Sequence, residues 1–229
     1  MKVCFVGSCI AKLYSIYFSY LNRAEEVKFI CAFKDDSRMS LKIRNTFCFN
    51  RLSDICGESL VNEINIYNNE ASEEFLSSCD KVFFQRFGFR PNIPSWEGAD
   101  CDDISDPNQL HFSLEKVSSL LDSPNKITEI SRMFYSSTEP LAYKETLSLE
   151  EKYSPKIKCS KIIEQNKEAL DAHEYCRWNT HLIPEVYLQV MNLICDDLNV
   201  ARLSEKELAD LSRENIFKHD KSYRKDTYK

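Results

Sequence analysis

The chain has 229 residues, of which 43% are hydrophobic and 12% aromatic, enough to bury one substantial core. Its formal net charge of -6 argues against broad nucleic-acid binding, so we expect no nucleic-acid partner. No apolar run is long enough to cross a bilayer, and we expect no membrane span. We expect one α/β domain over residues 1–215, followed by a flexible basic tail over residues 216–229.

The ten cysteines are spread along the whole chain, and no two of them form a CxxC pair. This spacing excludes zinc-ribbon and thioredoxin-type sites. Several cysteines lie in apolar runs, where a free thiol behaves as a small buried hydrophobe. The apolar run before Cys9 is too short for the core of a secretion signal. We therefore expect a reducing, cytoplasmic environment.

The first elements of the chain predict the fold class. Residues 2–7 form a short apolar run of β-forming residues that stops at a glycine, which is typical of a buried parallel strand. Apolar residues then recur at helical spacing from Ile10 to Leu21 and predict an amphipathic helix that begins near Cys9. A second strand is expected over residues 27–33. A strand-helix-strand order favours a three-layer αβα fold with a central parallel sheet.

Further elements follow along the rest of the chain. We expect helices over 70–79, 110–121 and 160–175, with 52–64 as another helical candidate, and strands over 80–88 and within 126–135. The helix over 160–175 is expected to be charged and on the surface. Pro184 fits the first turn of an apolar helix that runs through Leu198, and Ser204 with Glu207 form a capping box for a last helix.

Residues 89–106 are expected to form a polar loop. The loop carries four nearby carboxylates, which lack the glycine and terminal glutamate of a calcium loop: Asp100, Asp102, Asp103 and Asp106. We interpret the loop as solvated, with no metal bound.

Cys9 is the first candidate for chemistry, because it lies at the predicted strand-to-helix turn. The positive end of the helix dipole and the free backbone N–H groups there lower the pKa of a thiol and favour the nucleophilic thiolate. The same N–H groups can stabilise an oxyanion. The alternative is structural, since a small buried cysteine is common at such a turn.

His181 is the second candidate. It lies just before the helix whose start is fixed by Pro184, on a loop that could overhang the sheet, and it is the best general base among the four histidines. The alternative is a histidine that only makes a hydrogen bond near a helix start.

Together these two segments resemble the SGNH/GDSL hydrolase superfamily, which has its nucleophile in a Gly-Asp-Ser block after the first strand and its base in a late Asp-x-x-His block. In that alignment Ser8 takes the aspartate position, Cys9 takes the serine position, and residues 181–185 match the family's His-x-x-Pro-Glu run. A cysteine at the nucleophile position is similar to GSCFA-like proteins and to WcbI-type polysaccharide-biosynthesis proteins. The latter carry a strand that ends in glutamine, as residues 80–85 do here. The resemblance implies an SGNH-hydrolase-like or flavodoxin-like sheet.

The chain departs from the superfamily at Trp178, which stands where the aspartate of the triad is expected. The resemblance then implies a Cys–His pair assisted by Asn179 or by a carboxylate such as Asp171. The oxyanion donors of the superfamily are not evident either. The candidates for oxyanion or substrate binding are Ser8, Gln85, Arg86, Gly88 and Arg90.

The resemblance implies acetyl transfer or ester hydrolysis on a saccharide-type substrate during surface-polysaccharide biosynthesis. It implies a coenzyme A thioester as co-substrate and no required cofactor. The alternative is a non-catalytic binding or scaffold protein that has kept the fold and lost the triad, which the Trp178 departure favours. Nucleotide binding at the first turn is a weaker alternative, because neither a Walker pattern nor GxGxxG occurs.

Overall fold

A computed structural model describes residues 1–34, 65–66, 69–89, 103–104, 107–133, 135, 140–172 and 182–212. Five parallel strands form one sheet in the order β3-β2-β1-β4-β7. Their bounds are β1 Lys2–Gly7, β2 Glu26–Cys31, β3 Asn65–Ile66, β4 Lys81–Gln85 and β7 Ile127–Ile130. Two short strands, β5 (Gly88–Phe89) and β6 (Asp103–Ile104), pair separately.

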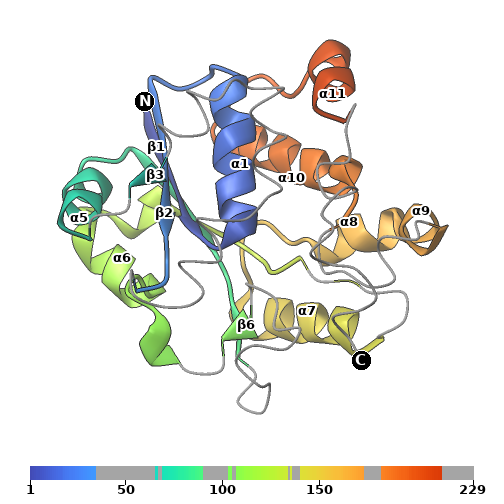
Figure 1. The fold of residues 1–229 in the computed structure, drawn as a ribbon, viewed down its shortest axis with the longest axis horizontal. Coiled ribbons are helices and arrows are strands. Elements are labelled where there is room, and N and C mark those ends of the chain that lie inside the picture. The colour runs from blue at the N-terminus through green and yellow to red at the C-terminus, as the bar shows by residue number, and fades with distance from the viewer. Residues whose placement is uncertain are drawn as a thin grey trace, which may run out of the picture.

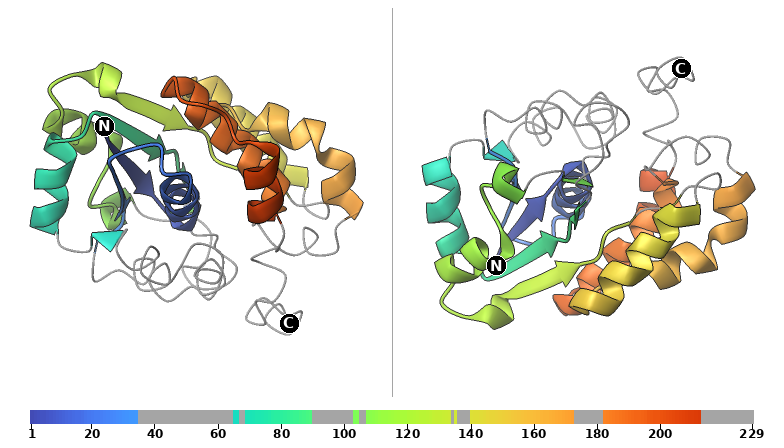
Figure 2. Two further views of the ribbon diagram at one scale, coloured as in Figure 1. Left: turned by 90° about the horizontal axis from the view of Figure 1, so that it is seen from above. Right: turned by 90° about the horizontal axis from the view of Figure 1, so that it is seen from below.

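Helices cover both faces of the sheet (Figures 1 and 2). One face carries α1 (Cys9–Tyr20) and α10 (Pro184–Asp197), and the other carries α5 (Asn69–Ser77) and α6 (Leu114–Leu120). The expected three-layer αβα fold is therefore confirmed. The remaining helices are α7 (Pro140–Tyr153), α8 (Ser160–Gln165), α9 (Lys167–Ala172) and α11 (Glu205–Ser212), with short 3-10 turns at Pro107–Gln109 and Pro124–Lys126.

Alternation along β1 explains how the sheet is buried on both sides. Phe5 lies in the hydrophobic cluster under α1 and α10, and its ring stacks on Phe83 of β4 at 5.1 Å between centroids. Cys4 and Val6 point to the opposite cluster, under α5 and α6. A parallel strand that is covered on both faces needs the nearly continuous apolar sequence seen in residues 3–6.

The strand order fixes where a site can lie. From β1 the chain moves outward through β2 to β3, and then returns to add β4 and β7 on the other side of β1. The third strand therefore lies at the edge of the sheet, whereas flavodoxin-like sheets have the second strand there. The order reverses between β1 and β4. In open α/β sheets the crevice at the carboxyl ends of such a strand pair is the usual ligand site.

Several expected elements differ in detail from the structure. The strand over 80–88 ends at Gln85, and the helix over 110–121 starts at Leu114 with Ser113 as its cap. The helix over 160–175 is two helices, and it is not a pure surface element, because α8 buries Ile162 and Ile163. The helix α7 has no counterpart in the sequence analysis. Residues 52–64, most of the acidic loop and the basic tail lie outside the described residues.

Three other expectations concern local chemistry. The capping box is confirmed: the Ser204 amide donates to Glu207 Oε2 at 2.7 Å, and the Glu207 amide donates to Ser204 Oγ at 3.3 Å. The cysteines within the described ranges are all buried: Cys4, Cys9, Cys31, Cys79, Cys159 and Cys195. No helix in the described part of the chain is both long and apolar enough to span a membrane.

Candidate functional site

The turn between β1 and α1 carries the predicted nucleophile. β1 ends at Gly7, Ser8 is the extended N-cap residue, and Cys9 is the first residue of the 12-residue helix α1. Both side chains are buried, with exposed fractions of 0% for Ser8 and 2% for Cys9. The thiol group therefore lies at the positively polarised N-terminus of a long helix, at the carboxyl end of the parallel strands.

Gln85 binds this turn from the end of β4, the strand next to β1. Its Oε1 atom accepts hydrogen bonds from the backbone N–H of Ser8 at 3.1 Å, from Ser8 Oγ at 2.9 Å and from the backbone N–H of Ala11 at 3.2 Å. The Ser8 side chain makes no capping bond to its own helix. Gln85 thus supplies, from a neighbouring strand, the acceptor that an N-cap side chain usually provides.

Gly7 allows the two strands' ends to come this close. A Cβ atom at position 7 would lie 2.7 Å from Ala11 Cβ, from Gln85 Cβ and from Gln85 Oε1. Two of these three contacts involve atoms next to the backbone, which cannot rotate away. The glycine is therefore required by the packing of β1, α1 and Gln85 around one point.

The nitrogen atom of the Gln85 amide differs from the oxygen in its hydrogen bonding. Gln85 is only 2% exposed, and its Nε2 atom is buried with no hydrogen-bond partner in the described part of the structure. Buried polar atoms in folded proteins are nearly always paired. This buried nitrogen can therefore still donate hydrogen bonds to a group that binds beside it.

Arg86, a predicted pocket residue, is engaged elsewhere. Its side chain pairs with Glu129 of β7 and lies over the ring of Tyr153, 4.4 Å from the centroid. Successive side chains of a strand point in opposite directions, so Gln85 faces the Cys9 turn and Arg86 does not. Gly88 pairs with Asp103 in the separate two-stranded sheet. The structure thus brings Ser8, Cys9 and Gln85 together and assigns Arg86 to the sheet edge.

The predicted base segment lies partly outside the described residues, which include neither Asn179, His181 nor Arg90. The chain is described again from Leu182, whose backbone N–H donates to Tyr187 Oη at 2.8 Å. The Tyr187 ring packs edge-on against Tyr14 of α1, with centroids 6.2 Å apart.

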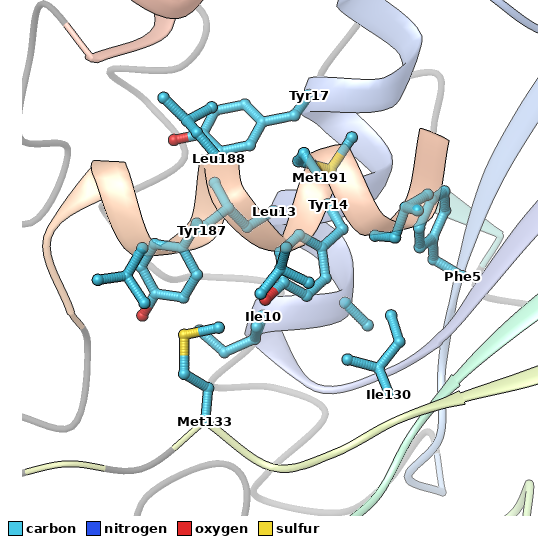
Figure 3. Packing of buried hydrophobic residues seen from close by; sticks show 14 of the residues in the cluster. Phe5, Ile10, Leu13, Tyr14, Tyr17, Ile130, Met133, Tyr187, Leu188 and Met191 are labelled. Atoms are coloured by element: carbon cyan, nitrogen blue, oxygen red, sulfur yellow. The ribbon is translucent and has the colours of Figure 1, made fainter. Parts of the chain in front are cut away.

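Figure 3 shows Tyr187 close to Ile10 and Met133 at the end of α1 that bears Cys9. Ile10 and Met133 belong to the same buried cluster as Tyr187. The start of α10 therefore lies on the same face of the sheet as α1 and near its first turns. The carboxylate candidate Asp171 accepts a hydrogen bond from Tyr135 Oη.

Two buried charged residues near the end of β7 were not predicted. Arg132 has an exposed fraction of 0% and pairs with Glu145 of α7 at 3.2 Å. Glu150 of α7 accepts from Ser131 Oγ at 2.5 Å and from the backbone N–H groups of Cys159 and Ser160 at 2.7 and 2.9 Å. Glu150 thus ties the end of β7 to the start of α8, a structural role that no local sequence pattern indicates.

Within the described ranges, no group of three or more histidine, cysteine or acidic residues is arranged to hold a metal ion. The geometry around Cys9 and Gln85 is therefore the main feature of the candidate site.

Searches of the chain against protein-family models, curated proteins and solved structures returned no match.

Proposed function

We propose that the protein catalyses acyl transfer or ester hydrolysis on a saccharide-type substrate, with Cys9 as the nucleophile and His181 as the general base. One observation carries the proposal: Cys9 begins a long helix at the point where the strand order reverses, beside a buried amide whose nitrogen has no partner within the described ranges. This combination of nucleophile, helix N-terminus and donor is what acyl chemistry requires.

The roles follow from elementary chemistry. The N-terminus of α1 stabilises negative charge on the Cys9 sulfur, and the thiolate needs less activation than a serine alkoxide. His181 accepts the thiol proton and later returns it to the leaving group or takes one from the acceptor, with Asn179 orienting the imidazole ring. A coenzyme A thioester supplies the acetyl group in the transfer reaction.

The choice of a saccharide acceptor and a coenzyme A donor is supported by the Gly-Ser-Cys and His-x-x-Pro-Glu segments, which resemble those of the WcbI-type and SGNH proteins. The position of α10 is compatible with this arrangement, because its start packs near the first turns of α1.

The direct test is acylation of Cys9. Purified protein is incubated with acetyl-coenzyme A or p-nitrophenyl acetate, and peptide mass spectrometry locates the acetyl group. We expect one acetyl group on Cys9, none in Cys9→Ala, and normal labelling in Cys31→Ala, which removes a thiol from the carboxyl end of the adjacent strand β2. Unlabelled Cys9 in folded protein, or acetyl groups on other residues only, would overturn the proposal.

A second candidate is a non-catalytic binding protein with the same fold. The 2% exposed fraction of Cys9 favours it, since a thiol that no substrate reaches cannot act as a nucleophile. This candidate predicts that Cys9 resists acetylation while coenzyme A or a saccharide still raises the melting temperature.

A further inference from the structure

The orientation of the Gln85 amide is determined by the fold. Two of the three groups that face its Oε1 atom are backbone N–H groups, of Ser8 and Ala11, and a backbone N–H can only donate. Rotating the amide by half a turn would place its NH2 group against these two donors. The oxygen therefore faces the turn, and Nε2 is held in one direction as a donor.

The same contacts place the Gln85 amide at the turn that carries Cys9. Cys9 lies between Ser8 and Ala11 in the chain, so the amide that binds both of these residues lies against the turn that carries the thiol. Gln85 ends β4 and Cys9 follows β1, and these neighbouring strands flank the point where the strand order reverses. A reacting group at Cys9 would lie in this crevice.

We propose that Gln85 is a catalytic residue whose Nε2–H donates to the carbonyl oxygen of the acyl donor and to the oxyanion that forms on it. This inference rests on the proposed function, and it gives a role to a buried nitrogen that has no hydrogen-bond partner among the described residues. A donor that is fixed before the reaction stabilises the developing charge without reorganisation.

The step is a thiolate addition followed by elimination. The Cys9 thiolate forms a carbon–sulfur bond to the carbonyl carbon, and the electron pair of the carbonyl double bond moves to oxygen, next to Gln85 Nε2. When that pair returns, the bond to the leaving group breaks, and the leaving group departs with its electron pair. The proton that Cys9 gave up beforehand is held by the general base.

Gln85→Glu separates this role from a structural one. A carboxylate can accept the same three hydrogen bonds through one oxygen, and those donors with the helix N-terminus keep it ionised. The second oxygen, however, is an acceptor where Nε2 was a donor. The variant therefore keeps the contacts to Ser8 and Ala11, loses the proposed oxyanion contact and adds a negative charge at the same place.

For each protein variant, two reactions of Cys9 are compared at a pH high enough that the thiol is fully ionised and the rate constant no longer changes with pH. Acetylation by p-nitrophenyl acetate passes through an oxyanion, whereas alkylation by iodoacetamide displaces iodide and forms no oxyanion at a carbonyl. We expect Gln85→Glu to lower the ratio of the acetylation to the alkylation rate constant by roughly 100-fold or more. Gln165→Glu, which adds the same charge at an exposed position on α8, should leave the ratio unchanged.

Gln85→Met keeps a similar volume and removes both the donor and the acceptor, so it provides the answer if the glutamate variant does not fold. In the uncharged Gln85→Met variant, a purely structural Gln85 predicts that both rate constants fall in parallel and that their ratio stays constant, which would overturn the inference alone. If wild-type Cys9 is alkylated and never acetylated, the proposed function itself fails.

Discussion

Gly7→Ala tests the packing that holds the candidate site together. The new Cβ would lie 2.7 Å from three atoms, whereas carbon atoms pack best at about 3.5–4.0 Å, so the end of β1 must move away from α1 or from Gln85. Overpacking of this kind costs about 1–3 kcal/mol. The reduced freedom of the unfolded chain offsets about 0.4–1 kcal/mol, because the Gly7 backbone is not in the left-handed region.

We therefore expect a net loss of about 1–2 kcal/mol in the free energy of unfolding, measured by urea titration with linear extrapolation. A double-mutant cycle supplies the control. Ala11→Gly removes one of the three clashing atoms, so the double variant Gly7→Ala/Ala11→Gly should lose less stability than the sum of the single changes. An unchanged or increased stability of Gly7→Ala would refute the close approach of β1, α1 and Gln85.

Three further predictions concern other residues. Glu150→Ala should lower the free energy of unfolding by about 2–3 kcal/mol, because it leaves the buried donors of Ser131, Cys159 and Ser160 without their acceptor; equal stability in denaturant titrations would show that the bonds are dispensable. Asp197→Asn tests a buried carboxylate: burial alone would raise its pKa, but hydrogen bonds from Lys156, Thr128 and Lys81 lower it overall. A carboxylate whose pKa is lowered by folding stabilises the fold at pH values above its pKa in the unfolded chain. We therefore expect Asp197→Asn to lower the free energy of unfolding by about 3 kcal/mol at pH 7, and this difference should shrink as the pH falls below about 4. A difference that does not depend on pH would contradict the ion-pair account. His181→Ala should slow acetylation of Cys9 by roughly 100-fold near neutral pH and leave the melting temperature within a few degrees; an unchanged acetylation rate would remove His181 from the mechanism.

The strongest periodic segments could be predicted from the sequence. The strand over residues 2–7 and the helix from Pro184 appear where they are expected, because continuous apolar residues and a helical repeat are local signals. The division of residues 160–175 was not predictable in the same way. Asn166 ends α8 by donating from Nδ2 to the Ile162 carbonyl at 2.7 Å, and it is also held by Gln189 of α10, a tertiary contact.

The helix α7 was missed for a related reason. Its residue Glu150 is only 4% exposed, although a glutamate in a charged segment is normally a sign of a solvated face. Its partners lie directly after β7 and at the start of α8, so the burial depends on the assembled fold. Local patterns carry no information about such partners.

For the candidate site, the sequence identified Cys9 and Gln85 but could not rank Gln85 above Arg86. The two residues are neighbours at the end of one predicted strand, and either could serve as a donor. The structure separates them, because alternation directs Gln85 to the Cys9 turn and Arg86 to Glu129. Which atom of the Gln85 amide stays unused depends on the backbone donors of α1, which only the three-dimensional arrangement reveals.

The distance between the Cys9 sulfur and the nearer ring nitrogen of His181, measured in a crystal structure with a bound thioester analogue, tests the central claim most directly. Our account predicts a separation of about 3–4 Å, close to hydrogen-bond range, with the analogue's carbonyl oxygen next to Gln85 Nε2. An imidazole on the opposite face of the sheet, or an analogue bound away from Cys9, would contradict it.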